Sequence, residues 1–349
     1  MGNLKYNNLV IKNYDELLNS ALEKAKGEFG LGREEFELLL TNSDIFDKLE
    51  NKITDLLLQQ QDISYLENWL NIFQKNQRTI VQEHPLMFLY FFLFIHASNS
   101  LFNRLKTEMH DRKVPVSDIV RMTLFGNLCR TVDEVGILLS NGSTRTALAV
   151  YRTVYEHAVV GIFLMKKDDE ALYQKFVDYA HKDVRKKADS LGKHFQALKF
   201  PSLENSHQQK IDTRTKELQG LYGDSFFNDY GWAKDHLDER PSFWAIEKAA
   251  EMERYRPFYI WASEFIHPSF QTLGDIQNEQ GKMVLGKLTE QSLDKHSFVD
   301  PMQLTLNAFY SFIDYLLYEY STDHQYQANI LLFRKILDRL LDNFKTESN

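Results

Sequence analysis

The stretch ALAVYRTVYEHAVVGIFLM, residues 147–165, decides the fold class of this chain. A helix of this sequence is apolar on almost every side, which is typical of a helix surrounded by other helices. Three polar side chains interrupt the apolar surface, those of Arg152, Glu156 and His157. We therefore expect these groups to be buried. Because a buried charge is costly unless it is paired, Arg152 and Glu156, one helical turn apart, should pair with each other.

Apolar residues recur with helical spacing over most of the remaining chain. The 349 residues include only 15 Gly and 7 Pro, too few for the many turns of a β-sandwich or barrel, while 25 Phe and 17 Tyr can fill a large core. We predict an all-α fold, a multi-helix bundle or array. At its centre we expect an antiparallel helical hairpin, because Asn141-Gly142 can end one helix in a left-handed turn and Ser143 can cap the next.

The chain is expected to have two parts, an N-terminal helical region over residues 1–78 and a main helical domain over residues 79–349. The main domain begins near the most apolar run of the sequence, LMFLYFFLFI at residues 86–95. This run is about half as long as the roughly 20 residues that a membrane-spanning helix needs. We therefore interpret it as a buried core helix.

Charge and cysteine content limit the possible partners and compartment. The formal net charge of -8 gives no general attraction to nucleic acid, so any RNA contact has to be local. The one cysteine, Cys129, excludes an internal disulfide framework and a cysteine-rich zinc module, and it fits a reducing compartment. The first residues lack the order of a secretory signal, so we expect a cytoplasmic protein without a membrane partner.

The simplest interpretation of the polar trio is that its residues have only a structural role. In a tight hairpin, residues equally far from the turn lie at similar heights, which puts Asn127 level with Glu156 and Arg130 level with Arg152. A buried ion pair with these neighbours would hold the two helices together, as such pairs often do. The protein would then be a non-catalytic helical interaction or scaffold protein.

A functional interpretation starts from the spacing of Arg152 and His157. This R-x4-H arrangement resembles the signature of the HEPN (higher eukaryote and prokaryote nucleotide-binding) helical ribonucleases, whose Arg and His act at a dimer interface. The resemblance implies a metal-independent ribonuclease or toxin of a bacterial anti-phage defence module, working as a homo-oligomer on RNA, with a possible defence partner protein and no cofactor. His would transfer a proton and Arg would stabilise the charge developing on phosphate. About 140° of helix separates the two residues, so a shared site needs side-chain reach or a second subunit.

A second resemblance covers roughly residues 116–274. The hairpin that ends in GSTRTALAVYRTVYE, the helix FVDYAHK and the segment YIWASEFIHPS look like a bacterial domain-of-unknown-function family, number 5677. Its recurring polar features, R-x3-E and S-x3-H, match Arg152 with Glu156 and Ser263 with His267. The family brings no established activity, so the resemblance implies a fold and a choice of residues rather than a reaction.

A third interpretation is a di-iron carboxylate enzyme built in a helical bundle. Asp178-x-x-His181 and Glu264-x-x-His267 each place a carboxylate and an imidazole one turn apart, and Glu156 and Glu134 could complete the ligand set. Pro268 after the second element and Asp in place of Glu in the first depart from that pattern.

We favour the ribonuclease and expect no metal site. The residues expected to act in catalysis are Arg152, Glu156, His157 and His267. Those expected to bind substrate are Asn127, Arg130, Lys182 and Ser263. Lys182 belongs to a basic run whose alternative role is that of an ordinary solvated helix surface.

Overall fold

The computed structural model describes residues 77–109, 113–202, 204–266, 296–320 and 324–346, together with residues 27, 71, 74 and 75. The chain divides into two compact units. One comprises Met1–Glu83 and Leu273–Leu293, and the other comprises His84–Thr272 and Asp294–Asn349. The predicted N-terminal region, residues 1–78, lies almost wholly outside the described residues, so the helices discussed below all belong to the second unit.

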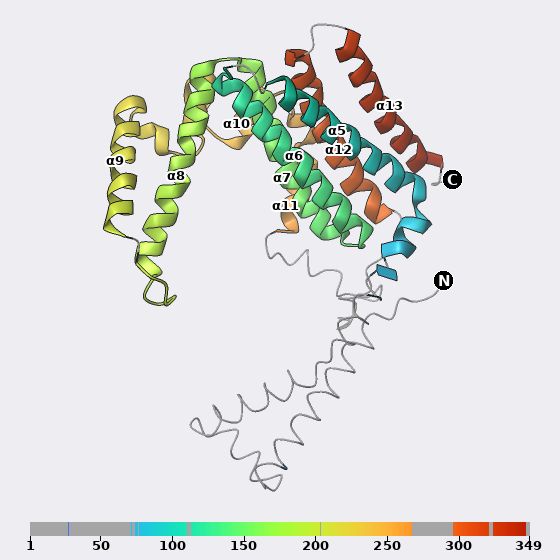
Figure 1. Cartoon of the computed structure of the whole chain (residues 1–349), viewed down its shortest axis with the longest axis horizontal. Coiled ribbons are helices and arrows are strands. Elements are labelled where there is room, and N and C mark those ends of the chain that lie inside the picture. The colour runs from blue at the N-terminus through green and yellow to red at the C-terminus, as the bar shows by residue number, and fades with distance from the viewer. Residues whose placement is uncertain are drawn as a thin grey trace. The chain divides into compact units, whose positions relative to one another are not determined.

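The second unit is built from helices, and none of its described residues lies in a strand (Figure 1). The predicted all-α class is therefore confirmed. Its α-helices are α5 (Pro85–Glu108), α6 (Val116–Ser140), α7 (Thr144–Lys167), α8 (Glu170–His194), α9 (Asn205–Tyr222), α10 (Phe243–Ala249), α11 (Arg256–Glu264), α12 (His296–Tyr320) and α13 (His324–Thr346). Three short 3-10 helices, η1 (Asp224–Phe227), η2 (Gly231–His236) and η3 (Glu253–Tyr255), connect α9, α10 and α11.

The predicted central hairpin is formed by α6 and α7. Its turn is left-handed at Gly142, whose φ is 76°, and the amide of Ser143 donates to the Leu138 carbonyl at 2.8 Å. Ser143 precedes the first residue of α7 as predicted, although its side chain makes no capping hydrogen bond. The next turn is less regular, because Asp168 ends α7 at a φ of 42° and Asp169 caps α8 by accepting from the amide of Ala171 at 2.9 Å.

Helix α7 lies at the centre of the unit, in contact with α6, α12, α10 and α11. A glycine sets its distance from α12. A Cβ built on Gly161 would lie 2.4 Å from Cε2 of Phe312, so a larger residue would have to displace this buried ring. The ring of Phe312 also packs against that of Phe125 of α6, with 6.0 Å between the ring centroids, and both rings are fully buried. The core of the unit is therefore the space between α5, α6, α7 and α12.

Helix α5 contains the apolar run of residues 86–95 and is only partly a core helix. Its inward side is buried and includes Phe91 and Phe94, but Leu89 and Leu93 are exposed, which corrects the expectation of a wholly buried helix. Among the described residues, α5 and α7 are both long and apolar enough to cross a membrane by length and composition alone. Of their most apolar windows, 39% is buried in α5 and 61% in α7, and a mostly buried core helix passes the same test.

Candidate functional site

The polar trio of α7 lies on the one part of this helix that neighbouring helices leave uncovered. Every residue of that strip is exposed or half-buried, and we call it the open face of α7. It consists of Arg145, Thr146, Ala149, Val150, Arg152, Thr153, Glu156, His157 and Val160. The expectation that the charged groups are buried is therefore wrong, because α7 is covered on three sides rather than four. Residues 161–165 of the helix are buried again, and Trp232 packs there against Phe163.

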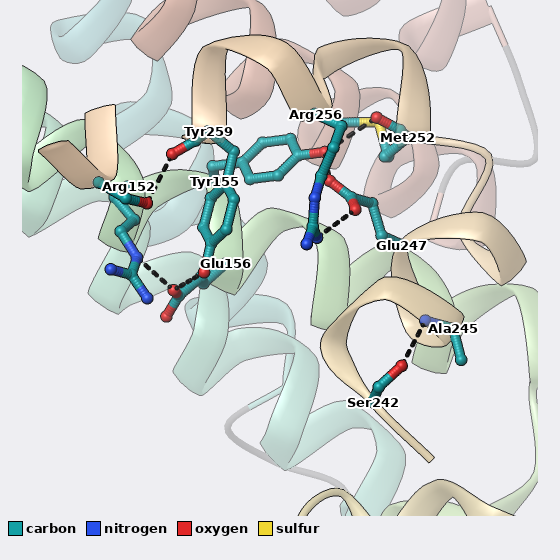
Figure 2. A network of polar contacts seen from close by, with 10 residues as sticks. Arg152, Tyr155, Glu156, Ser242, Ala245, Glu247, Met252, Arg256 and Tyr259 are labelled. Atoms are coloured by element: carbon teal, nitrogen blue, oxygen red, sulfur yellow. Dashed lines mark hydrogen bonds and ion pairs between the residues drawn. The ribbon is translucent and has the colours of Figure 1, made fainter. Parts of the chain in front are cut away.

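Arg152 is held in place from two directions. Its Nε donates to Oε1 of Glu156 at 2.9 Å, which confirms the predicted pair, and its guanidinium lies 4.9 Å from the centre of the Tyr259 ring (Figure 2). Tyr259 in turn donates its hydroxyl to the same carboxylate oxygen at 2.8 Å. Because Glu156 engages only Nε, the terminal amino groups of Arg152 remain available to an anion, and 25% of the side chain is exposed.

The protonation of these groups follows from their surroundings. Burial opposes the charged form of Arg152, but the hydrogen bond with Glu156 and the nearby negative charge outweigh it and raise the pKa of the guanidinium. Burial, followed by the hydrogen bond to Glu156, raises the pKa of Tyr259 to about 12. Arg152 therefore stays a cation and Tyr259 stays a hydrogen-bond donor through the physiological range.

A second arginine–glutamate pair lies on the other side of Tyr259 (Figure 2). Nη1 of Arg256 donates to Oε2 of Glu247 at 2.8 Å, and its guanidinium lies 5.3 Å from the Tyr259 ring centre. Glu247 has no exposed surface, and its other oxygen accepts from the hydroxyl of Tyr155 on α7. The carboxylate of this second pair is buried, whereas 30% of the Arg256 side chain is exposed, and the pair fastens α10 and α11 to α7.

His157 lies at the edge of the open face, away from Arg152. Its Nδ1 is 2.7 Å from the carbonyl oxygen of Thr153, one turn earlier in the same helix. Since a carbonyl oxygen can only accept, Nδ1 must hold the proton in the neutral ring, which leaves Nε2 as a free acceptor. His157 is half-buried, so this nitrogen can be reached from the solvent side of α7.

Arg152 and His157 share the open face but are not in contact. They lie about 140° apart around the helix, and among the described residues no hydrogen bond or ion pair joins them. Thr153 and Glu156 occupy the space between them on the helix surface. A ligand that touches both therefore has to bridge this distance, or else the two groups act from two copies of the chain.

The predicted substrate-binding residues have other partners. Arg130 donates to Asn127 at 2.9 Å along α6, so this pair is satisfied within its own helix rather than with Glu156. Ser263 donates to the Tyr259 carbonyl at 2.7 Å and thereby braces the turn of α11 that holds the Tyr259 ring. The predicted catalytic residue His267 lies outside the described residues.

Lys182 lies on α8 and is connected to the site through a loop. Its Nζ donates to Asp229 at 2.7 Å and to the hydroxyl of Tyr179 at 2.8 Å. That same hydroxyl accepts from the backbone amide of Tyr230 at 3.0 Å. Burial, and next the charge of Glu156, raise the pKa of Tyr230, and its ring centroid lies 6.3 Å from that of Phe243 beside the site. Lys182 therefore supports the loop beside the site.

The sequence did not predict which aromatic residues lie around Arg152. Phe243 lies 5.1 Å from Tyr259 and 6.3 Å from Tyr230, measured between ring centroids, so three rings from separate segments meet beside the open face. Of the three, only Tyr259 belongs to the segment YIWASEFIHPS, where it stands four residues before Ser263. No local spacing signals the other two, because Tyr230 precedes the short helix η2 and Phe243 is the first residue of the short helix α10.

The described residues do not support the di-iron ligand set. Asp178 accepts from Arg214 and from Tyr222 of α9, at 2.7 and 2.8 Å, and His181 lies 2.9 Å from Oγ1 of Thr215. These contacts join α8 to α9. Within the described ranges, no three His, Cys, Asp or Glu side chains come together as metal ligands.

Replacing Tyr259 with Phe tests how Arg152 is held. The variant keeps the ring beside the guanidinium but removes the hydrogen bond to Glu156, and we expect the free energy of unfolding to fall by about 1 kcal/mol. Tyr259→Leu, which also removes the ring, should lose more. Urea denaturation of the three proteins measures both steps. Equal stability of all three would show that Tyr259 does not brace the pair.

Comparison with known proteins agrees with part of the sequence interpretation. Residues 118–283 match the model of a family of unknown function, DUF5677, which covers just under half of the chain and includes Arg152, Glu156 and Ser263. No curated protein and no solved structure matches the chain. The R-x4-H resemblance to HEPN ribonucleases is not tested by these comparisons and stays a prediction.

Proposed function

We propose that the open face of α7 is the active site of an HEPN-like, metal-independent ribonuclease. The observation that supports this most is the state of Arg152 and His157. Arg152 is oriented by Glu156 and Tyr259 with its terminal amino groups free of any carboxylate, and His157 has a free Nε2 on the same face. A guanidinium and a basic imidazole are the two groups that RNA transesterification needs.

The reaction assigns one task to each group. Nε2 of His157 accepts the proton of an RNA 2′-hydroxyl, whose oxygen attacks the adjacent phosphorus. The bond from phosphorus to the 5′-oxygen of the next nucleotide breaks, and that oxygen takes a proton from a water molecule, which leaves a 2′,3′-cyclic phosphate and a free 5′-hydroxyl. The hydroxide formed takes the proton held by His157 and so restores the neutral ring. The terminal amino groups of Arg152 bind the phosphate oxygens as negative charge develops on them. Glu156 orients Arg152 and takes no part in proton transfer.

A second copy of the chain fits this site. Because Arg152 and His157 lie on opposite edges of the open face, one phosphate is most easily reached by Arg152 of one copy and the partner's His157. RNA is then the substrate, the homo-oligomer is the working form, and the cytoplasm is where the protein would act. A toxin of a bacterial defence module, with a partner protein that restrains it, is the biological role that this chemistry suits.

The rival proposal, a non-catalytic interaction protein, has its own support. The Tyr259–Glu156 hydrogen bond ties α11 to α7, and Tyr155 with Arg256 and Glu247 ties the same helices deeper in the fold. Both pairs would then serve only to join helices. This alternative predicts loss of stability and no enzymatic activity when Arg152 is removed.

A cleavage assay decides between the two proposals. End-labelled single-stranded RNA is incubated with the full chain in EDTA, and the products are tested for a 2′,3′-cyclic phosphate end. We expect Arg152→Ala to lower the rate by about 10²–10³-fold, the usual effect of removing a group that stabilises transition-state charge. Arg104→Ala is the matched control and should cleave normally, because Arg104 is an exposed arginine of α5 that pairs with Glu108 and lies outside the open face. No cleavage by the wild-type chain, or equal rates for both variants, refutes the ribonuclease.

A further inference from the structure

Five large apolar side chains form an exposed surface at the start of α5, which we call the α5 patch. Their exposed fractions range from 37% to 57%, and they are Leu86, Leu89, Phe92, Leu93 and Ile137. Ile137 belongs to α6, but its neighbour Gly136 lies against α5, because a Cβ built there would be 3.0 Å from the rings of Phe91 and Phe92. The patch therefore includes residues of two helices that pack against each other.

The α5 patch is also free of charge. From Pro85 to Asn103 the chain contains no Asp, Glu, Lys or Arg, although α5 exposes a side chain at about every second position of this stretch. Helix surfaces that face water usually contain charged residues. An exposed apolar area on the order of 400 Å² is large enough to mark an interaction site. Something is therefore expected to cover it.

The chemistry of the patch excludes two kinds of partner. Nucleic acids and anionic lipid surfaces are attracted by Lys and Arg, which this part of α5 lacks, and the chain has a net charge of -8. A membrane core is also too thick. The exposed apolar residues run from Leu86 to Leu93, about 10 Å of helix, whereas a bilayer core is about 30 Å across. Another protein surface of similar character remains.

The spacing of the patch fits a copy of itself. Leu86, Leu89 and Leu93 follow the 3–4 spacing of a coiled-coil seam, in which leucines of one helix pack between leucines of another. An apolar core of about 400 Å² with a polar rim is about half of the roughly 800 Å² that each partner buries in a stable dimer. A two-fold axis makes such a patch self-complementary.

We propose that the α5 patch is the interface of a homodimer, in which the α5 helices of two copies cross near Leu89. The proposal does not depend on the ribonuclease, because the patch residues belong to α5 and α6 and not to the open face of α7. Leu89 is the best residue to test, because it is 57% exposed and replacing it disturbs little of the core.

Sedimentation of the full chain tests the interface. We expect the wild type to be a dimer at micromolar concentration, and Leu89→Glu to raise the dissociation constant at least 100-fold, because it places two carboxylates side by side. Leu221→Glu is the matched control. Leu221, on α9, is 67% exposed, and its replacement should leave the dimer intact. Circular dichroism melts check that both variants fold. A monomeric wild type, or a dimer unaffected by Leu89→Glu, overturns the proposal.

Opposite charges provide a rescue. Leu89→Lys should also be monomeric, but an equimolar mixture of Leu89→Glu and Leu89→Lys should form a heterodimer, since the two-fold axis brings the paired charges together. Absence of rescue, with both variants folded, rejects a crossing near Leu89. Leu89-dependent binding of a monomeric chain to phosphatidylcholine vesicles would overturn the dimer in favour of a lipid surface. The RNA assay is scored separately, so a failed dimer and a failed ribonuclease can be told apart.

Discussion

His157→Ala should abolish RNA cleavage and leave the fold intact. Removing a positioned general base costs about 10²–10⁴-fold in rate. The effect on stability should be small, because the ring is half-buried and its one hydrogen bond is to the Thr153 carbonyl of its own helix. The melting temperature is therefore expected to stay close to that of the wild type, while the initial rate on single-stranded RNA in EDTA falls to background.

The matched control is His207→Ala on α9, an exposed histidine whose Nδ1 lies 3.7 Å from a carboxylate oxygen of Glu204. This variant should cleave RNA at the wild-type rate. A variant lacking His157 that still cleaves would remove the proposed base and leave only an anion-binding role for Arg152. If His157→Ala unfolds at the temperature of the assay, the histidine is a structural residue. This result would favour the non-catalytic interaction protein.

The fold class and the central hairpin could be predicted because their signals are local. Gly142 is the residue type that tolerates a positive φ, and the apolar spacing on either side of it is helical over about 25 residues. The Arg152–Glu156 pair was predictable for the same reason, since residues four apart on a helix are always neighbours.

The exposure of this pair could not be predicted from the sequence. Whether a side of α7 is covered depends on how far α11 and α6 extend over it, which is a tertiary property. Residues 147–165 are apolar even along the open face, where Ala149, Val150 and Val160 stand among the polar groups. An apolar helix with one uncovered face has the same sequence character as one that is fully enclosed.

The residues that contact the Arg152–Glu156 pair could not be predicted from the sequence either. Tyr259 is 103 residues from Glu156 in sequence, and its role arises because α11 crosses α7 at the height of Arg152. Glu247 had no distinguishing feature, because it is one of 49 acidic residues and stands beside a lysine in a short helix. It is nevertheless the fully buried acid of this region, with 0% exposure. Long-range contacts of this kind decide which of two similar pairs supports the fold.

Glu247→Ala should be one of the most destabilising single changes near the site, lowering the free energy of unfolding by about 1.5–3 kcal/mol. The substitution leaves the Arg256 guanidinium without its carboxylate and removes one acceptor of the Tyr155 hydroxyl, which keeps only the Met252 carbonyl at 2.9 Å. Urea denaturation gives the loss directly. The Tyr155 hydroxyl is buried, so water cannot replace the lost carboxylate there, whereas the Arg256 side chain is 30% exposed and stays partly solvated.

Glu239→Ala is the control variant, because it breaks an exposed ion pair of the same helix. Glu239 also pairs with a cation of α10, Lys248, but its side chain is 43% exposed, and an exposed pair contributes about 0–1 kcal/mol. If the two variants lose similar amounts, burial does not distinguish the pairs, and Arg256 with Glu247 does not fasten α10 and α11 to α7. If Glu247→Ala alone is strongly destabilised while Arg152→Ala keeps its stability, the deeper pair supports the fold. The pair on the open face is then free to act on a ligand.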